Sequence, residues 1–184
     1  MTAIKIKIDD ARTDCDVNAS HFFGGVMMPE SWLKGGVFSP TDLFLCVIDL
    51  SQLKKAVGES QIKDSGFLYF FVDTESSPAA CKALYAESPD SYVEFNYDAE
   101  TEFDVETARP IRFEKGESGS AMFIRDEKVY DGETCLLRFD TAEFKEIDFL
   151  SDLDGYLYFI IDNKSLDRGE YNKTKLYFVD KKGE

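Results

Sequence analysis

Short apolar segments recur along the chain with the length of β-strands. Residues 43–48 and 67–72 are uninterrupted apolar runs of six residues each. Near the start, Ile4, Ile6 and Ile8 alternate with polar residues, as in a strand with one face in water. Further strands are expected at 92–97, 111–113 and 175–179, and a short helix between Pro78 and Pro89. The pattern predicts an α+β fold that is mostly β-sheet with a few short helices.

Two parts of the chain repeat each other. The segments CVIDLSQLKK (46–55) and GFLYFFVD (66–73) return as LRFDTAEFKE (137–146) and GYLYFIID (155–162). The shared Gly, Leu, Tyr, Phe and closing Asp of the second pair keep identical spacing, and both pairs keep the same order. We therefore predict two copies of a strand–short helix–strand unit, at about residues 43–73 and 135–162, related by internal duplication. The last strand of each copy is expected to be apolar on both faces and central in a sheet.

Each copy is expected to start its helix with a capping box. Asp49 is followed three residues later by Gln52, and Asp140 three residues later by Glu143. In such a box the Asp side chain accepts from first-turn amides, and the Gln or Glu side chain bonds the amide of the cap residue. Because the cap accounts for both aspartates, we interpret them as structural and not as a catalytic pair.

Length and charge limit what the chain can be. It has 184 residues and a mass of 20.9 kDa, the size of one domain, and no linker divides it. We predict a single domain over residues 1–184. With 21 basic and 36 acidic residues, the net charge is −15. Such a charge repels phosphate backbones and anionic lipids, so we expect no nucleic-acid partner and no membrane partner.

Cysteine usage and the N-terminal sequence favour a cytoplasmic location. The four cysteines form no CxxC pair, and we expect reduced, structural thiols; they are Cys15, Cys46, Cys81 and Cys135. Residues 1–10 lack the pattern of a signal peptide. The longest apolar runs are far shorter than the about 20 residues of a membrane span.

Residues that carry chemistry are sparse. His21 is the single histidine and has no Cys or His companion at a ligand spacing, so neither a metal site nor a cofactor is expected, and no catalytic residue is assigned. Gly24 and Gly25 are expected in a tight turn or at a close backbone approach. The nearby apolar residues cover the sheet or rim a groove; they are Phe22, Phe23, Met27, Met28 and Trp32.

The strongest candidate for a functional surface is the acidic stretch 83–108. It contains eight acids and no Lys or Arg, with aromatic residues between them. Carboxylates steer a basic partner, and aromatic rings anchor it. The candidate partner-binding residues are Glu94, Tyr97, Asp98, Glu100, Glu102 and Asp104. An ordinary strand with an acidic solvent face and buried aromatics is the alternative interpretation, and it remains open.

Several segments resemble the YwqG-like family of bacterial proteins. The resemblance lies in the segment SHFFGGVMMP (20–29) with Trp32, in residues 43–73 and in residues 135–179. Val26 or Met27 stands where the family usually has proline. The resemblance implies a mixed α/β fold with an internal repeat, no obvious active site, and an immunity-like role, because family members often occur beside toxin and immunity genes.

Three functions follow from these observations as hypotheses. The first is a non-catalytic protein-binding module that inhibits a basic effector. The second is a small-ligand binder or enzyme with a cleft between the two repeats. The third is a structural or assembly subunit that pairs through an exposed strand edge. The oligomeric state is not predicted.

Overall fold

Twelve strands form two sheets in the computed structural model, which describes residues 3–10, 14–58, 62–76, 80–94, 107–116, 123–124, 132–145 and 147–181. Ten strands form the large sheet: β1 (Ala3–Ile8), β2 (His21–Phe22), β4 (Asp42–Asp49), β5 (Phe67–Asp73), β6 (Ala80–Ala86), β8 (Arg109–Gly116), β9 (Phe123–Ile124), β10 (Glu133–Asp140), β11 (Gly155–Asp162) and β12 (Lys175–Asp180). The small sheet pairs β3 (Val26–Met28) with β7 (Ser91–Val93).

The helices are short. They are α1 (Glu30–Lys34), α2 (Leu50–Val57), α3 (Asp148–Ser151) and α4 (Asn163–Asp167), with 3-10 helices η1 (Thr141–Phe144) and η2 (Tyr171–Lys173). The predicted α+β class, mostly sheet with a few short helices, is confirmed. The helix expected between Pro78 and Pro89 is wrong, because this segment contains β6, which pairs with β5 along its whole length.

The large sheet has a pseudo-twofold strand order. From one edge to the other it reads β12-β11-β10-β9-β1-β8-β2-β4-β5-β6. The antiparallel pair β1–β8 lies at its centre. On either side of this pair, a strand of one half pairs with a strand of the other. Strand β2 of the N-terminal half pairs with β8, and β9 of the C-terminal half pairs with β1. The pseudo-twofold order therefore covers five strands in each half, more than the predicted strand–helix–strand units contain.

The two hairpins share the same irregularity. The β4–β5 register shifts between Phe44 and Cys46, and the β10–β11 register shifts between Cys135 and Leu137. Counted from the strand ends Asp49 and Asp140, these bulges occupy the same position. A bulge bends its strand and increases local twist, so both hairpins are bent at the same position.

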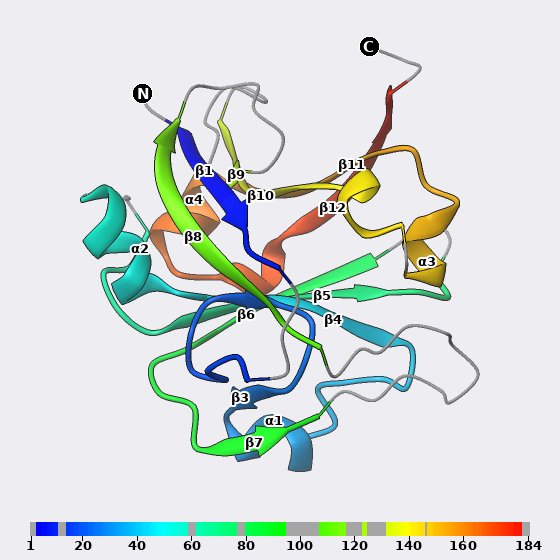
Figure 1. Ribbon diagram of the computed structural model, residues 1–184. Coiled ribbons are helices and arrows are strands. Elements are labelled where there is room, and N and C mark those ends of the chain that lie inside the picture. Colours follow the sequence, from blue (N-terminus) through cyan, green and yellow to red (C-terminus); the bar gives the residue numbers. More distant parts are fainter. Residues whose placement is uncertain are drawn as a thin grey trace.

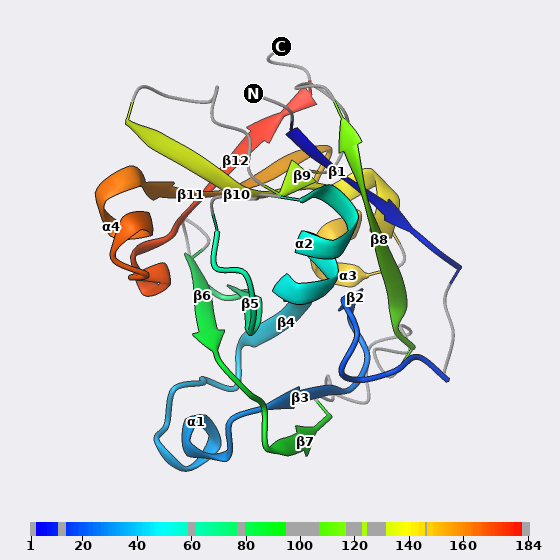
Figure 2. The same ribbon diagram turned by 90° about the vertical axis from the view of Figure 1, so that its left-hand side faces the viewer.

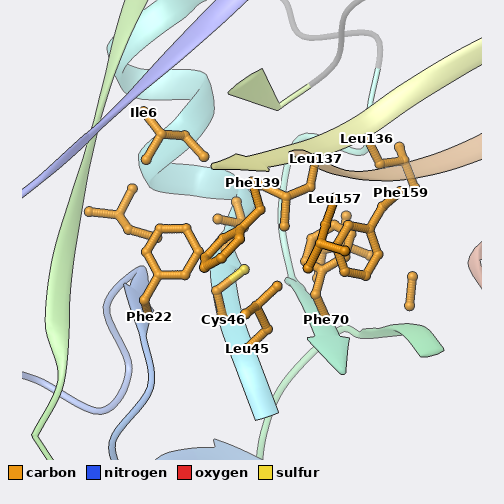
Figure 3. Close-up of a cluster of buried hydrophobic side chains, with 14 of the residues drawn as sticks. Ile6, Phe22, Leu45, Cys46, Phe70, Leu136, Leu137, Phe139, Leu157 and Phe159 are labelled. Atoms are coloured by element: carbon orange, nitrogen blue, oxygen red, sulfur yellow. The ribbon is translucent and has the colours of Figure 1, made fainter. Parts of the chain in front are cut away.

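One hydrophobic core fills the space between the two halves. Figure 1 shows β10–β12 above and β4–β6 below, joined at one side by β1 and β8. In Figure 3, side chains from both halves point toward each other. The ring centroids of Phe70 and Phe159 are 5.1 Å apart, and those of Phe22 and Phe139 are 5.4 Å apart. Figure 2 shows α2 at the open side of this core. This helix buries Leu50, Leu53 and Val57 in it.

The first capping box is only half as predicted. Asp49 Oδ1 accepts from the amides of Ser51 (2.8 Å) and Gln52 (3.4 Å), so the cap itself is confirmed. The Gln52 side chain does not return to the cap. Its Oε1 accepts from the amide of Ser20 at 3.0 Å, while the Asp49 amide donates to Ser20 Oγ at 2.9 Å. Ser20, just before β2, thus takes the place expected of Gln52.

The second copy begins its helix differently. Asp140 accepts from the Ala142 amide at 2.9 Å, but the turn that follows is the 3-10 helix η1, and Glu143 is exposed. The α-helix α3 starts only after this turn. The second unit is therefore strand–3-10 helix–short α-helix–strand, a variation on the predicted plan.

A small outer layer covers one half of the large sheet. Strands β3 and β7 with α1 pack on the outer face of β4–β5 (Figure 1). The Trp32 ring meets Tyr69 edge-on at 5.2 Å, and Phe38 lies 4.8 Å from Phe71. Of the apolar residues whose role was open, Met28 joins this layer. Phe22 and Phe23 enter the main core instead.

Candidate functional site

The structure describes only one of the six predicted partner-binding residues. Glu94 follows β7 directly and is exposed. The other five lie outside the described residues; they are Tyr97, Asp98, Glu100, Glu102 and Asp104. The described end of the candidate surface is therefore formed by β7 and Glu94.

Tyr92 is the prominent side chain at this end. It is 49% exposed, and its hydroxyl donates to Glu94 Oε1 at 2.8 Å. Its ring lies against Gly25, where an added Cβ would come within 2.1 Å of the Tyr92 hydroxyl. The backbone beneath is fixed by the β3–β7 pairing, in which Met27 lies opposite Tyr92. A well-supported aromatic ring thus stands partly in solvent just before residues 94–106, the part of the chain richest in acids.

The first part of the acidic stretch has structural roles. Asp90 Oδ1 accepts from the Glu30 amide at 2.6 Å and so supports the start of α1. Tyr85 stacks on Tyr171 at 5.7 Å, and the Lys63 ammonium lies 3.8 Å from its ring centroid. The stretch 83–108 is therefore not one continuous surface, because its β6 part holds the two ends of the large sheet together.

His21 stabilises a turn from inside the protein. It is fully buried, and the carbonyl oxygens of Ala19 and Gly25 face its two ring nitrogens at 2.7 and 3.0 Å. Both carbonyls favour a protonated ring, but burial outweighs them and lowers the pKa of His21 below its ordinary value. The predicted turn is confirmed, since Phe23 and Gly24 have φ angles of 52° and 73°.

Gly24 also allows a close backbone approach. An added Cβ would lie 2.8 Å from the Cβ of Ala108 and 2.9 Å from its amide nitrogen. The prediction for Gly24 is confirmed in both forms, since it adopts a left-handed conformation in the turn and approaches the backbone of Ala108. Gly25 makes room for the side chain of Tyr92.

The described residues offer little for metal or thiol chemistry. Within them, no group of three or more His, Cys, Asp or Glu lies close enough together to hold a metal ion. The four cysteines are free thiols, and Cys46 and Cys135 are buried. Burial raises the pKa of Cys46 well above its usual range and raises that of Cys81 to about 12. Among the residues that the structure describes, no helix is long and apolar enough to cross a membrane.

The expected cleft between the repeats has no room where the two hairpins face each other. That space holds the main core, including the close contact of Phe70 with Phe159.

A second face, on which Arg138 is buried, Tyr156 and Tyr158 are half-buried and Tyr177 is exposed, was missed by sequence reasoning. On the outer side of β10–β12, the Arg138 guanidinium lies 3.8 Å from the ring centroid of Tyr156, and Tyr177 is 42% exposed. The expectation that β11 is apolar on both faces is therefore wrong. Tyr156 and Tyr158 sit at alternate positions of β11, and this polar-tipped pattern is the signal that could have revealed the face.

Comparisons with known proteins add no relative. No family model matches the chain, and no curated protein matches it.

Proposed function

We propose that this chain is a non-catalytic, cytoplasmic bacterial protein that acts as a protein-binding module for a basic protein. Its resemblance to the YwqG-like family favours one form of this function, an immunity-like inhibitor of a basic effector. The observation that carries the proposal is Tyr92, an exposed ring held by Glu94 where the most acidic part of the chain begins.

Charge supports a basic partner. Residues 94–106 contain six carboxylates and no lysine or arginine, and the whole chain carries a net charge of −15. A field of one sign accelerates the encounter with a partner of the opposite sign, and this acceleration weakens as salt screens the charges. Fast, salt-sensitive association suits an inhibitor that must reach its target before the target acts.

Tyr92 supplies what charge alone does not. Tyrosine is enriched among the residues that dominate interface energies, because its ring buries a large area while its hydroxyl keeps a polar partner. The bond to Glu94 and the support from Gly25 hold this ring before any partner arrives. Little side-chain entropy is then lost on binding.

The first experiment identifies and then uses the partner. The tagged protein is captured from lysate of its source bacterium at low and at high salt, and a basic protein retained only at low salt is purified. Its association rate is then measured by stopped flow across ionic strengths. We compare the intact chain with a variant in which four carboxylates are neutralised: Glu94→Gln, Asp98→Asn, Glu100→Gln and Glu102→Gln.

The expected result is an association rate about tenfold lower at low salt, with a flatter salt dependence. The matched control neutralises four exposed acids elsewhere: Glu75→Gln, Glu143→Gln, Asp152→Asn and Asp167→Asn. This control has the same net charge and should lose much less. Equal slowing by both variants would mean that only net charge matters, and an unchanged rate in the first variant would contradict the proposal.

The anchor is tested by dissociation. Tyr92→Ser should raise the dissociation rate about tenfold with little change in association, because a buried aromatic anchor acts mainly on the bound state. Leu33→Ser, another exposed apolar side chain of the outer layer, is the control and should leave dissociation unchanged. A Tyr92→Ser complex with the normal lifetime would remove Tyr92 from the interface.

A further inference from the structure

The large sheet ends on β6 at one side and on β12 at the other, and these two edges differ in how they are covered. At the β6 edge, the Tyr85 ring stacks on Tyr171 of η2 at 5.7 Å, and Cys81 Sγ donates to the Thr174 carbonyl oxygen at 3.6 Å. Strand β12 comes near β6 at its own start, and Figure 1 and Figure 2 both show the rest of β12 running away from β6. Among the described residues, no strand pairs with this outer edge of β12.

Alternate residues of β12 turn their backbone groups away from the sheet. In an antiparallel pair, every second residue exchanges hydrogen bonds with the residue opposite it. The Lys181 amide donates to the Asp154 carbonyl oxygen at 3.0 Å, and the same β11–β12 register runs along the whole of β12 without a shift. The odd-numbered residues of β12 therefore bond β11, whereas the N–H and C=O groups of Leu176 and Phe178 point outward from the edge.

The middle of this edge is apolar on both sides of the sheet. Tyr177 and Phe178 point to opposite faces, because successive strand residues do so, and they are 42% and 43% exposed. Natural edge strands are usually protected by a proline, a bulge or a charge within the strand. The sequence of β12 is KLYFVD, so it has no proline, and its charged residues, Lys175 and Asp180, stand only at its two ends. An edge of this kind is suited to pairing with another strand.

The charges at the two ends of β12 suit a second copy of the same strand. Two copies related by a twofold axis pair antiparallel, so the start of one strand meets the end of the other. In either register that the outward groups allow near the middle of β12, the residue opposite Lys175 is next to Asp180 of the second copy. The other cation at that end, Lys181, already bonds Asp140 of its own chain at 2.8 Å. A parallel pair would instead set lysine beside lysine.

We propose that two copies of this chain pair through β12, antiparallel and about a twofold axis, so that their large sheets join into one. With the axis beside Tyr177, the two Tyr177 rings face each other on one side of the sheet, and Leu176 packs against Phe178 on the other. With the axis beside Phe178, the two Phe178 rings face each other. Both registers bury exposed rings and bond the outward backbone groups, and cross-strand pairs of this kind stabilise a sheet.

The expected dimer is weak and depends on salt. Two paired six-residue strands bury less area than the about 1,200 Å² at which stable interfaces begin, so we expect a dissociation constant of about 10–200 µM. Each chain carries a net charge of −15, and salt screens the repulsion between two such chains. The dimer should therefore become tighter as salt rises, whereas binding of the proposed basic protein should weaken. The two proposals use different surfaces, and either can fail without the other.

Sedimentation equilibrium of the full-length protein tests the pairing from about 5 µM to about 1 mM, at about 0.05 and 0.5 M salt. We expect the mass to rise from 20.9 kDa toward twice that value, at lower protein concentrations in high salt. Tyr177→Lys and Phe178→Lys each place a charge within the edge and should weaken the dimer about tenfold or more. Leu33→Lys is the matched control, because it makes the same charge change at another exposed side chain, and it should dimerise as the intact chain does.

Amide exchange measured by NMR on the intact chain shows whether this edge is the interface. The amides of Leu176 and Phe178 should exchange about twofold or more slowly at about 1 mM protein than at about 50 µM, whereas β11 protects the amides of Tyr177 and Val179 at both concentrations. The proposal is overturned if the protein stays monomeric in every condition, if both lysine variants dimerise normally, or if the Leu176 and Phe178 amides exchange equally fast at the two concentrations. Circular dichroism verifies that each variant is folded.

Discussion

Replacing Gly24 by alanine tests the central turn more sharply than any other single change. Two costs combine at this position. Gly24 has φ = 73°, and a left-handed conformation costs an alanine about 1–2 kcal/mol. In addition, the new Cβ would lie 2.8 Å from the Cβ of Ala108 and 2.9 Å from its backbone nitrogen, which is closer than real Cβ atoms come. Ala108 is buried beside β8, so the contact is not relieved by moving a flexible side chain.

The steric cost can be measured separately because the chain contains a matched glycine. Gly36 has φ = 65°, but nothing lies within 4 Å of an added Cβ there. Gly36→Ala should therefore lose only the conformational part, about 1–2 kcal/mol. Gly24→Ala should lose a further 1–3 kcal/mol or so, the usual cost of overpacking a filled site.

The assay is urea unfolding at pH 7, followed by circular dichroism. Both variants should unfold at lower urea with the slope of the intact protein, and the midpoint of Gly24→Ala should fall clearly further. Equal losses would refute the reasoning, because they would show that Ala108 moves away at no cost. A changed slope would mean that the variant alters the denatured state or the two-state transition, and the comparison would then use hydrogen exchange.

Three further predictions concern single contacts. Gly25→Ala places a Cβ against the exposed Tyr92 hydroxyl, so it should cost less stability than Gly24→Ala but shift the NMR signals of the Tyr92 ring and slow binding of the basic partner. Asp140→Ala removes a cap and the carboxylate that bonds Lys181. A loss of about 1–3 kcal/mol by urea unfolding is expected, and a loss below about 0.5 kcal/mol would contradict this role. Burial lowers the pKa of His21 in the folded state, so the unfolded chain takes up a proton at a higher pH than the folded protein. The free energy of unfolding should therefore fall as pH drops below about 6.5. His21→Gln should reduce this pH dependence, as measured by urea unfolding between about pH 7.5 and 5.5.

The likeness of residues 66–73 and 155–162 was visible in the sequence, and both segments contribute buried side chains to the same core. Strands β5 and β11 keep their inward side chains apolar at every second position, and Leu68 and Leu157 are both buried against the opposite half. Asp49 and Asp140 mark where each strand ends and a turn begins. These are local requirements, and local patterns reveal them.

The exchange of strands at the centre could not be found in the same way. Whether β2 pairs with its own half or with β8 depends on contacts between residues far apart in the chain, such as His21 with Pro110. Likewise, Ala80–Ala86 contains several residues that favour helices, yet it forms β6 because pairing with β5 outweighs intrinsic preference. At the first cap, Ser20 and not Gln52 accepts from the Asp49 amide. This contact also joins residues far apart in the chain, so the sequence pattern did not reveal it.

The candidate site was only partly predictable for a related reason. Sequence cannot tell an exposed tyrosine from one that packs on a neighbouring element. Tyr85 and Tyr92 both lie in the acidic stretch, but only Tyr92 stands in solvent, while Tyr85 stacks on Tyr171 from a distant part of the chain. The same ambiguity hides the outer face of β11, where a run of aromatic and aliphatic residues resembles a strand buried on both sides.

The outer faces of the two halves of the sheet carry different side chains, because only the half with β4 and β5 is covered by the outer layer of β3, β7 and α1. Residues 23–41 join β2 to β4 and include β3 and α1, whereas only residues 125–132 join β9 to β10. Val47 and Arg138 occupy the same register position in the two hairpins, as do Phe67 and Tyr156. Since the backbone pairing is equivalent, the change from apolar to polar-tipped side chains reflects what lies above them. Val47 is covered by the outer layer, whereas Arg138 is covered by the rings of Tyr156 and Tyr158 from the neighbouring strand. One half of the sheet is therefore covered by a layer from its own connecting segment, whereas the other half has tyrosine side chains at the corresponding positions.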